Sequence, residues 1–179
     1  MKKVISVMAC MFVIIMLCSC KGEGGGLFAK PTPTPIPEIN PLSILSAEDI
    51  YPIVGYAPVL DGNNYTRDGN KATAYYRSEP LGQDPVILTV TQYTESISIN
   101  DVWYEYDAGR VKRPSAMPVQ NLGEDAYIAF PSIHVFDRGC QIQITAGSGA
   151  DEIQQNVLLA LAQKAVANFE AFMPAPEIQ

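Results

Sequence analysis

Short runs of hydrophobic residues that alternate with polar ones occupy most of the chain after residue 56. In the run VILTVT, Val86, Leu88 and Val90 fall on one side of an extended chain, which is the two-residue period of a β-strand. Turn-forming Gly, Pro, Asp and Asn residues separate the runs. The pattern predicts strands at residues 57–60, 72–78, 86–93, 127–130, 133–136 and 140–146.

Three segments have helical patterns instead. Ser46 is a predicted N-cap of a helix that ends at Gly55, and Ser98 is the N-cap of a second helix over residues 99–107 that ends at Gly109. The third predicted helix covers residues 151–172, with apolar residues along one side. The order helix, strands, helix, strands, helix predicts an α+β domain, in which helices cover an antiparallel sheet and the long C-terminal helix packs across it.

The N-terminus has the pattern of an export signal. Lys2 and Lys3 precede 14 uncharged residues, 4–17. This apolar run is shorter than the roughly 20 residues of a membrane-spanning helix, and it fits the apolar region of a secretory signal peptide. A buried core helix is the alternative, but such a helix would normally have a polar face.

The residues that follow, Leu17-Cys18-Ser19-Cys20, resemble the lipobox of bacterial lipoproteins. The resemblance implies that residues 1–19 are removed as a lipoprotein signal peptide and that Cys20 carries a diacylglyceryl thioether. Two or more acyl chains anchor a protein stably to a bilayer. We therefore expect a lipid anchor on the outer face of the cell membrane, with ordinary cleavage and a free Cys20 as the alternative.

A tether of residues 20–40 is predicted between this anchor and the folded part. Glycines begin it, and Pro31, Pro33, Pro35 and Pro37 then alternate with other residues, which favours extended polyproline II structure. Thr-Pro repeats of this kind resemble the stalks of Gram-positive surface lipoproteins, so a Gram-positive type of envelope is favoured. Residues 41–179 form the single extracytoplasmic domain.

Composition narrows the set of partners. The chain has 179 residues, a formal net charge of −7 and a pI of about 4.6, which argues against binding to nucleic acid or to anionic lipid.

Cys140 is the one cysteine in the predicted domain, so no internal disulfide is expected and Cys140 should pack as an apolar residue on a strand. We expect a monomer.

Candidate catalytic chemistry is sparse. His134 is the single histidine, which is too few for a zinc site of nitrogen and sulfur ligands, and no Gly-x-Ser-x-Gly motif accompanies it. Glu124 and Asp125 are interpreted as charges at a helix start. Gly147-Ser148-Gly149 is interpreted as helix capping, with anion binding as the alternative. We expect no catalytic residue, no metal and no cofactor, and therefore no enzyme.

The strongest candidate binding surface combines aromatic and basic residues. Trp103, Tyr104 and Tyr106 lie on the second predicted helix, and aromatic side chains with a polar group suit carbohydrate or peptide ligands. A basic loop with Arg110, Lys112 and Arg113 follows, which could meet an anionic cell-wall polymer or an envelope protein. Core packing of the aromatic residues and a solvated basic loop are the alternatives.

Four segments, LSAEDIYPIVG, ATAYYR, VQNLGEDAYIAF and HVFDRGCQIQI, together resemble the small lipoproteins of unknown function of actinobacterial envelopes and the extracellular sensor domains of some serine/threonine kinases. The resemblance implies an extracytoplasmic fold with a cleft and no catalytic residues. The expected function is a lipid-anchored, non-catalytic binding or sensing domain. The alternatives are an accessory subunit of a membrane complex and, less favoured, a cell-wall hydrolase.

Overall fold

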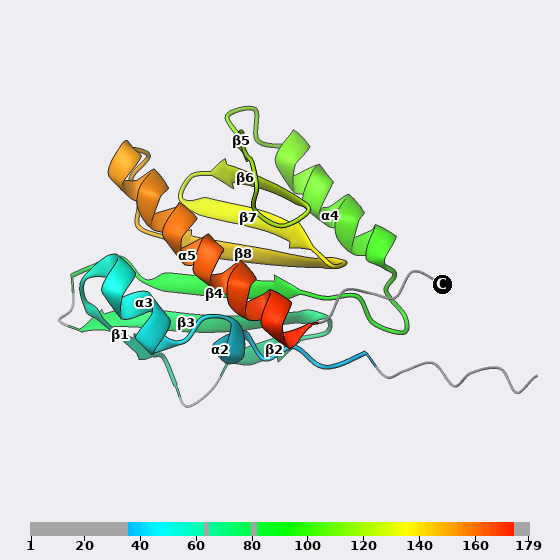
Figure 1. Cartoon of the computed structure of the whole chain (residues 1–179), viewed down its shortest axis with the longest axis horizontal. Helices are drawn as coiled ribbons and strands as arrows, with labels where there is room; N and C mark the ends of the chain where they lie inside the picture. The colour runs from blue at the N-terminus through cyan, green and yellow to red at the C-terminus, as the bar shows by residue number, and fades with distance from the viewer. Residues whose placement is uncertain (1–35, 63–64, 80–81, 174–179) are drawn as a thin grey trace, which may run out of the picture. The chain divides into compact units, whose positions relative to one another are not determined.

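A computed structural model of the chain describes residues 36–62, 65–79 and 82–173. All of these residues belong to one compact unit, Ile36–Gln179. The described part contains four helices and eight strands (Figure 1). They are α2 (Pro41–Ile44), α3 (Ala47–Val54), β1 (Ala57–Leu60), β2 (Thr66–Asp68), β3 (Lys71–Glu79), β4 (Val86–Thr91), α4 (Ile99–Val111), β5 (Met117–Val119), β6 (Asp125–Ala129), β7 (Ser132–Asp137), β8 (Cys140–Ala146) and α5 (Glu152–Phe172).

The strands form one open sheet in the order β1-β3-β4-β8-β7-β6-β5, with β2 paired to one end of β3. Every pair is antiparallel, and β3–β4, β6–β7 and β7–β8 are pairs of consecutive strands. The pairing of β4 with β8 joins the two halves of the sheet, and α4 connects β4 to the far strand β5. The predicted α+β class and antiparallel sheet are confirmed.

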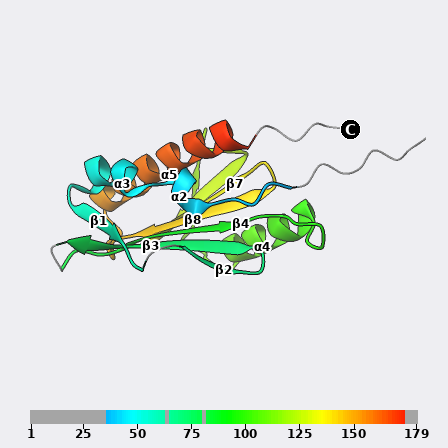
Figure 2. The same cartoon turned by 90° about the horizontal axis from the view of Figure 1, so that it is seen from below.

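Helices lie on both sides of the sheet. Figure 2 shows α2, α3 and α5 on one side and α4 on the other. The main core lies under α5, whose Leu158, Leu161, Ala165 and Phe169 recur every three or four residues and are fully buried. The C-terminal helix therefore packs across the sheet as its pattern predicted. None of the helices in the described ranges is long and apolar enough to cross a membrane.

A smaller core lies under α4. Val102 and Tyr106 of this helix pack against Tyr127, Ala129 and Phe136 of β6 and β7. Five antiparallel residue pairs hold β6 and β7 in register, from Asp125 opposite Phe136 to Ala129 opposite Ser132. Because side chains of a strand alternate between the two faces, the same strands serve the main core with their other residues.

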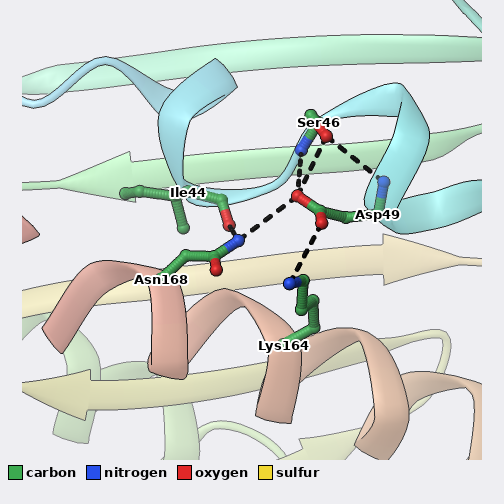
Figure 3. Close-up of polar contacts among 5 residues, drawn as sticks. All are labelled: Ile44, Ser46, Asp49, Lys164 and Asn168. Atoms are coloured by element: carbon green, nitrogen blue, oxygen red, sulfur yellow. Dashed lines mark hydrogen bonds and ion pairs between the residues drawn. The ribbon is translucent and has the colours of Figure 1, made fainter. Parts of the chain in front are cut away.

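Helix α3 is fixed to α5 by polar contacts centred on Asp49 (Figure 3). Its carboxylate accepts hydrogen bonds from the N–H and hydroxyl groups of Ser46 at 3.1 and 2.9 Å. It also contacts two α5 residues, the Asn168 amide at 3.2 Å and the Lys164 ammonium at 3.2 Å. Burial acts to raise the pKa of Asp49, but the Ser46 bonds and Lys164 together hold it below the usual value. Asn168 also donates to the Ile44 carbonyl at 3.0 Å, so α5 holds both short helices.

The helix boundaries agree with the capping signals except in α4. Ser46 and Ser98 are N-caps, and Gly55 ends α3 in a left-handed conformation. Helix α4, however, continues through Gly109 to Val111. A Cβ at Gly109 would lie 3.1 Å from the Tyr127 hydroxyl, so this glycine allows close approach of helix and sheet and is not a cap.

Three short elements were not expected. Helix α2 starts at Pro41 with Asn40 as its N-cap, β2 precedes β3, and β5 lies within the expected loop after α4. The packed region also begins before residue 41, because Ile39 is fully buried in the main core. Part of the sequence assigned to the tether is thus integrated into the domain.

Candidate functional site

A cleft lies at the end of the sheet where β4 begins and β8 ends. It has a volume of about 170 Å³. Five parts of the chain line it: the end of α3, the residue before β1, the residues before β4, the end of β8, and the first turns of α5. The lining residues are Val54, Tyr56, Gln83, Asp84, Ala146, Gly147, Gln154 and Val157.

Gln154 is held in the cleft by the backbone that follows β8. Its amide nitrogen donates a hydrogen bond to the Ala146 carbonyl. Gly147 has a φ of 69°, and a Cβ at this position would lie 2.1 Å from the Gln154 Oε1 atom. Glycine therefore provides both the backbone conformation and the space that the Gln154 amide occupies. The amide oxygen of Gln154 lies over Gly147 while its nitrogen is engaged.

The loop before β4 is fixed through Asp84. The Asp84 backbone carbonyl accepts a hydrogen bond of 2.6 Å from the Tyr56 hydroxyl. The Asp84 carboxylate accepts a bond of 3.0 Å from Ser148. Burial, together with the Asp84 charge, raises the pKa of Tyr56. Among the described residues that line the cleft, Asp84 is the one charged residue, so the cleft carries a negative charge.

An apolar groove adjoins the cleft and runs between α3 and α5. It is lined by Pro52, Ile53, Ile153, Asn156, Val157 and Ala160, with a volume of about 400 Å³. Val157 also lines the cleft, so the two hollows share a wall. Ile153, on the first turn of α5, is 76% exposed.

The chain enters the domain at the opposite end of β4. The buried Gln92 side chain, just after β4, accepts a bond of 2.9 Å from the Ile39 N–H and donates one of 3.2 Å to the Pro37 carbonyl. Arg67 donates to the Ile39 carbonyl at 2.7 Å and pairs with Glu38 at 2.8 Å. We call these contacts the entry clamp. Strand β4, whose six residues span roughly 20 Å, separates the cleft from the entry clamp.

The aromatic residues proposed as a binding surface are divided by the structure. Tyr106 is fully buried beneath α4, and Trp103 is half-buried, with its ring edge-on to Phe136 at 4.9 Å between centroids. Tyr104 is 71% exposed on the other side of the helix. Core packing, the alternative left open for these residues, therefore describes Tyr106, and the three side chains form no common surface.

The basic residues are also separated. Arg110 lies within α4, where it contacts Asp107 at 2.6 Å and Asp125 at 3.2 Å. The bond to Asp107 contributes most to raising the pKa of Arg110 above its usual value. Arg113 points its guanidinium to the Tyr127 hydroxyl at 3.4 Å, and Lys112 is exposed at the helix end. The expected basic loop is thus a helix end whose charges are partly neutralised.

Asp125 does not lie at a helix start, as its sequence neighbours suggested. It is the first residue of β6, and it accepts hydrogen bonds from Tyr106 at 3.1 Å and Arg110 at 3.2 Å. A carboxylate between a phenol and a guanidinium fixes α4 to the start of β6. The Asp125 carboxylate therefore helps to hold the smaller core together.

His134 is buried in the smaller core and away from the cleft. Its ring stacks on Tyr127 at 4.6 Å with an interplanar angle of 13°, and its Nδ1 lies 3.3 Å from the Gln141 amide nitrogen. Burial, with a contribution from Arg113, lowers the pKa of His134 to about 4. Residues 36–62, 65–79 and 82–173 contain no group of His, Cys, Asp and Glu that would hold a metal ion.

Cys140 packs as expected and Cys20 lies outside the described residues. Cys140 is fully buried on β8, and burial raises the pKa of its thiol to about 12, so the thiol is unreactive at neutral pH. The predicted signal peptide and most of the predicted tether also lie outside the described residues.

The residues that line the cleft could not be recognised from the sequence because they come from five separate parts of the chain. The one available signal was Gly147-Ser148-Gly149, which was interpreted as helix capping. In the structure Asp151 is the N-cap of α5, and Gly147 and Ser148 hold cleft residues. Comparisons with protein-family models, with curated proteins and with solved structures found no match to this chain. The resemblance to envelope lipoproteins stays a prediction.

Proposed function

We propose that this protein is a lipid-anchored extracytoplasmic binding or sensing domain without catalytic activity, and that it holds its cleft away from the membrane. The observation that carries the proposal is the position of the cleft and the entry clamp at opposite ends of β4. With acyl chains on Cys20, the clamp end of the domain faces the anchor and the cleft faces outward.

The entry clamp supports this orientation because it fixes where the tether leaves the domain. Gln92 and Arg67 hold three consecutive residues, Pro37 to Ile39, and Ile39 is itself buried in the main core. A tether attached by a single exposed residue would leave the exit direction undefined. Here the exit point is built into the fold.

The chemistry of the cleft supports binding. Its polar groups are amides, a phenol and one carboxylate, which orient a ligand through hydrogen bonds. Paired acid and base groups would support catalysis, but the single histidine, His134, lies in the smaller core under α4. A binding domain is therefore favoured over a hydrolase.

An accessory role in a membrane complex is the second candidate. It is favoured by Tyr104 and Val111, which lie seven residues apart on α4 and are 71% and 72% exposed. Residues at this spacing share one side of a helix. Two exposed apolar side chains on one side of a helix suit a protein partner, whereas the cleft suits a smaller ligand.

Attachment through Cys20 is tested by Cys20→Ser in a bacterium that processes lipoproteins. The wild-type protein should stay in the membrane fraction after a high-salt wash, because acyl chains hold it by hydrophobic burial. Cys20→Ser should appear in the soluble extracytoplasmic fraction. Immunoblotting of the two fractions gives the result.

Cys18→Ser is the matched control, since it changes a neighbouring cysteine within the predicted signal peptide and should leave attachment intact. Retention of Cys20→Ser in salt-washed membranes would contradict the lipid anchor. So would a native mass that lacks the added acyl groups.

A further inference from the structure

We propose that the cleft and the apolar groove form one site for a small amphiphilic amine, with the cationic head beside Asp84 and the apolar body along the groove between α3 and α5. This inference rests on the proposed binding function and names its ligand class. It follows from the adjacency of the two hollows, from the polar groups that line the cleft, and from the charge of Asp84.

The two hollows adjoin at Val157, which lines both of them. On α5, Ile153, Val157 and Ala160 are spaced four and three residues apart, so they share one side of the helix. Pro52 and Ile53 of α3 form the facing wall. Further along the same seam, Lys164 and Asn168 contact Asp49, and these polar contacts fix the position of α3 on α5 (Figure 3). The groove is therefore bounded by fixed elements and lies beside the cleft.

Three lining residues present hydrogen-bond acceptors, and a fourth, Gln83, has an amide that can both donate and accept. The Gln154 nitrogen is already bonded to the Ala146 carbonyl, and its oxygen lies over Gly147. The Tyr56 hydroxyl donates to the Asp84 backbone, which leaves its oxygen as an acceptor. A carboxylate accepts several hydrogen bonds, so the Asp84 side chain has capacity beyond the bond from Ser148. A ligand head that donates hydrogen bonds fits this set.

The charge of the lining determines which hydrogen-bond-donating head group is favoured. Asp84 is the charged residue of the lining, and Lys and Arg do not occur among the described residues of either hollow. The N-cap of α5, Asp151, and the first-turn residue Glu152 add negative charge near the cleft. An ammonium group gains from this environment, whereas a carboxylate or phosphate head meets a like charge.

The volumes suit a small head and a larger apolar body. A cleft of about 170 Å³ holds a group equivalent to about five or six water molecules, and the groove is about 400 Å³. Each methylene that moves from water into the groove should increase affinity about fourfold. A short alkylamine should therefore bind more weakly than a longer one.

The test uses the chain from residue 20 onward with Cys20→Ser, which removes the lipid and keeps the tether and domain. Octylammonium, octanol, octanoate and butylammonium are titrated below their aggregation concentrations and followed by calorimetry. We expect octylammonium to bind about tenfold more tightly than octanol, octanoate to bind more weakly than octanol, and butylammonium to bind far more weakly than octylammonium.

Two variants separate the head from the body. Asp84→Asn keeps an oxygen that accepts from Ser148 but removes the charge, so the preference for octylammonium over octanol should disappear. Ile153→Ser should weaken all three eight-carbon probes. Val111→Ser is the matched control, because Val111 is 72% exposed, lies on α4 and is remote from the site.

Equal or tighter binding of octanol or octanoate would overturn the inference, and so would an unchanged preference in Asp84→Asn. Tight octanoate binding that Ile153→Ser weakens would overturn the amine class alone and would leave the binding function standing. Binding of none of the probes would also overturn the inference, while attachment through Cys20 is decided separately by the fractionation experiment.

Discussion

Replacing Tyr106 with alanine should lower the free energy of unfolding by about 3–5 kcal/mol. Tyr106 is the centre of the smaller core, where its ring lies 5.4 Å from Trp103, 5.2 Å from Tyr127 and 5.7 Å from Phe136. Truncation removes a fully buried aromatic ring and leaves a cavity beneath α4. It also removes the hydrogen bond to Asp125. Urea unfolding of the Cys20→Ser chain from residue 20 onward measures the change.

The same helix provides the control for Tyr106. Tyr104→Ala makes the same chemical change at a side chain that is 71% exposed, and it should alter stability by no more than about 0.5 kcal/mol. Tyr106→Phe keeps the ring and removes only the hydroxyl, which should cost about 1 kcal/mol. Similar losses for Tyr104→Ala and Tyr106→Ala would contradict the assignment of Tyr106 to the core.

Acid should destabilise the domain through His134. The side chain is buried and uncharged, and its pKa falls from about 6.5 to about 4 on folding. Between these values the unfolded chain binds a proton that the folded chain does not bind, so stability is lost as pH falls from 6.5 to 4. The shift corresponds to about 3 kcal/mol of stability lost across this window. Urea unfolding at a series of pH values follows the loss.

His134→Gln isolates this contribution, since glutamine keeps a hydrogen-bonding group opposite Gln141 and does not titrate. Asp137 acts in the opposite direction, because burial raises its pKa and its protonation in the folded state favours folding at low pH. Both proteins contain Asp137, so its contribution cancels in the comparison. The free energy of unfolding of the wild type relative to that of His134→Gln should therefore fall as pH falls from 6.5 to 4. A constant difference across this range would contradict a neutral, buried His134.

The elements that the sequence predicted are those whose signals are local. The alternation in β4 and β8 and the three-to-four-residue spacing of Leu158, Leu161 and Ala165 follow from burial of one face. Ser46 and Ser98 each form a capping box with the aspartate three residues later. Such patterns involve neighbours within one turn or one strand, so they can be interpreted without knowledge of the fold.

The errors arose where a distant contact decides the outcome. Gly109 looked like a helix end, but it lies where α4 approaches Tyr127, and the helix continues through Arg110. Asp125 looked like a helix-start charge because its partners, Tyr106 and Arg110, are distant in sequence. The sequence did not distinguish buried from exposed aromatic residues in α4, because three aromatic residues close together do not indicate which of them faces the sheet.

The candidate site is the least predictable part of the molecule. Its cleft unites Tyr56, Asp84 and Gln154, which are separated by 28 and 70 residues and carry no motif. The entry clamp depends on Gln92 reaching back to Pro37 and Ile39, more than 50 residues earlier. Both features follow from the antiparallel order of the sheet, which places the two ends of β4 beside segments distant in sequence.

The orientation of the domain on a membrane can be measured with fluorophores at the two ends of β4. Glu38→Cys and Gln83→Cys place single reactive thiols at the entry clamp and at the cleft, because both residues are exposed and the Cys140 thiol is buried and unreactive. Each lipidated variant is labelled with a fluorophore and placed in vesicles that contain nitroxide-labelled lipids. If the entry clamp faces the membrane, the label at residue 38 should be quenched more strongly than the label at residue 83. Equal quenching, or stronger quenching at residue 83, would contradict this orientation.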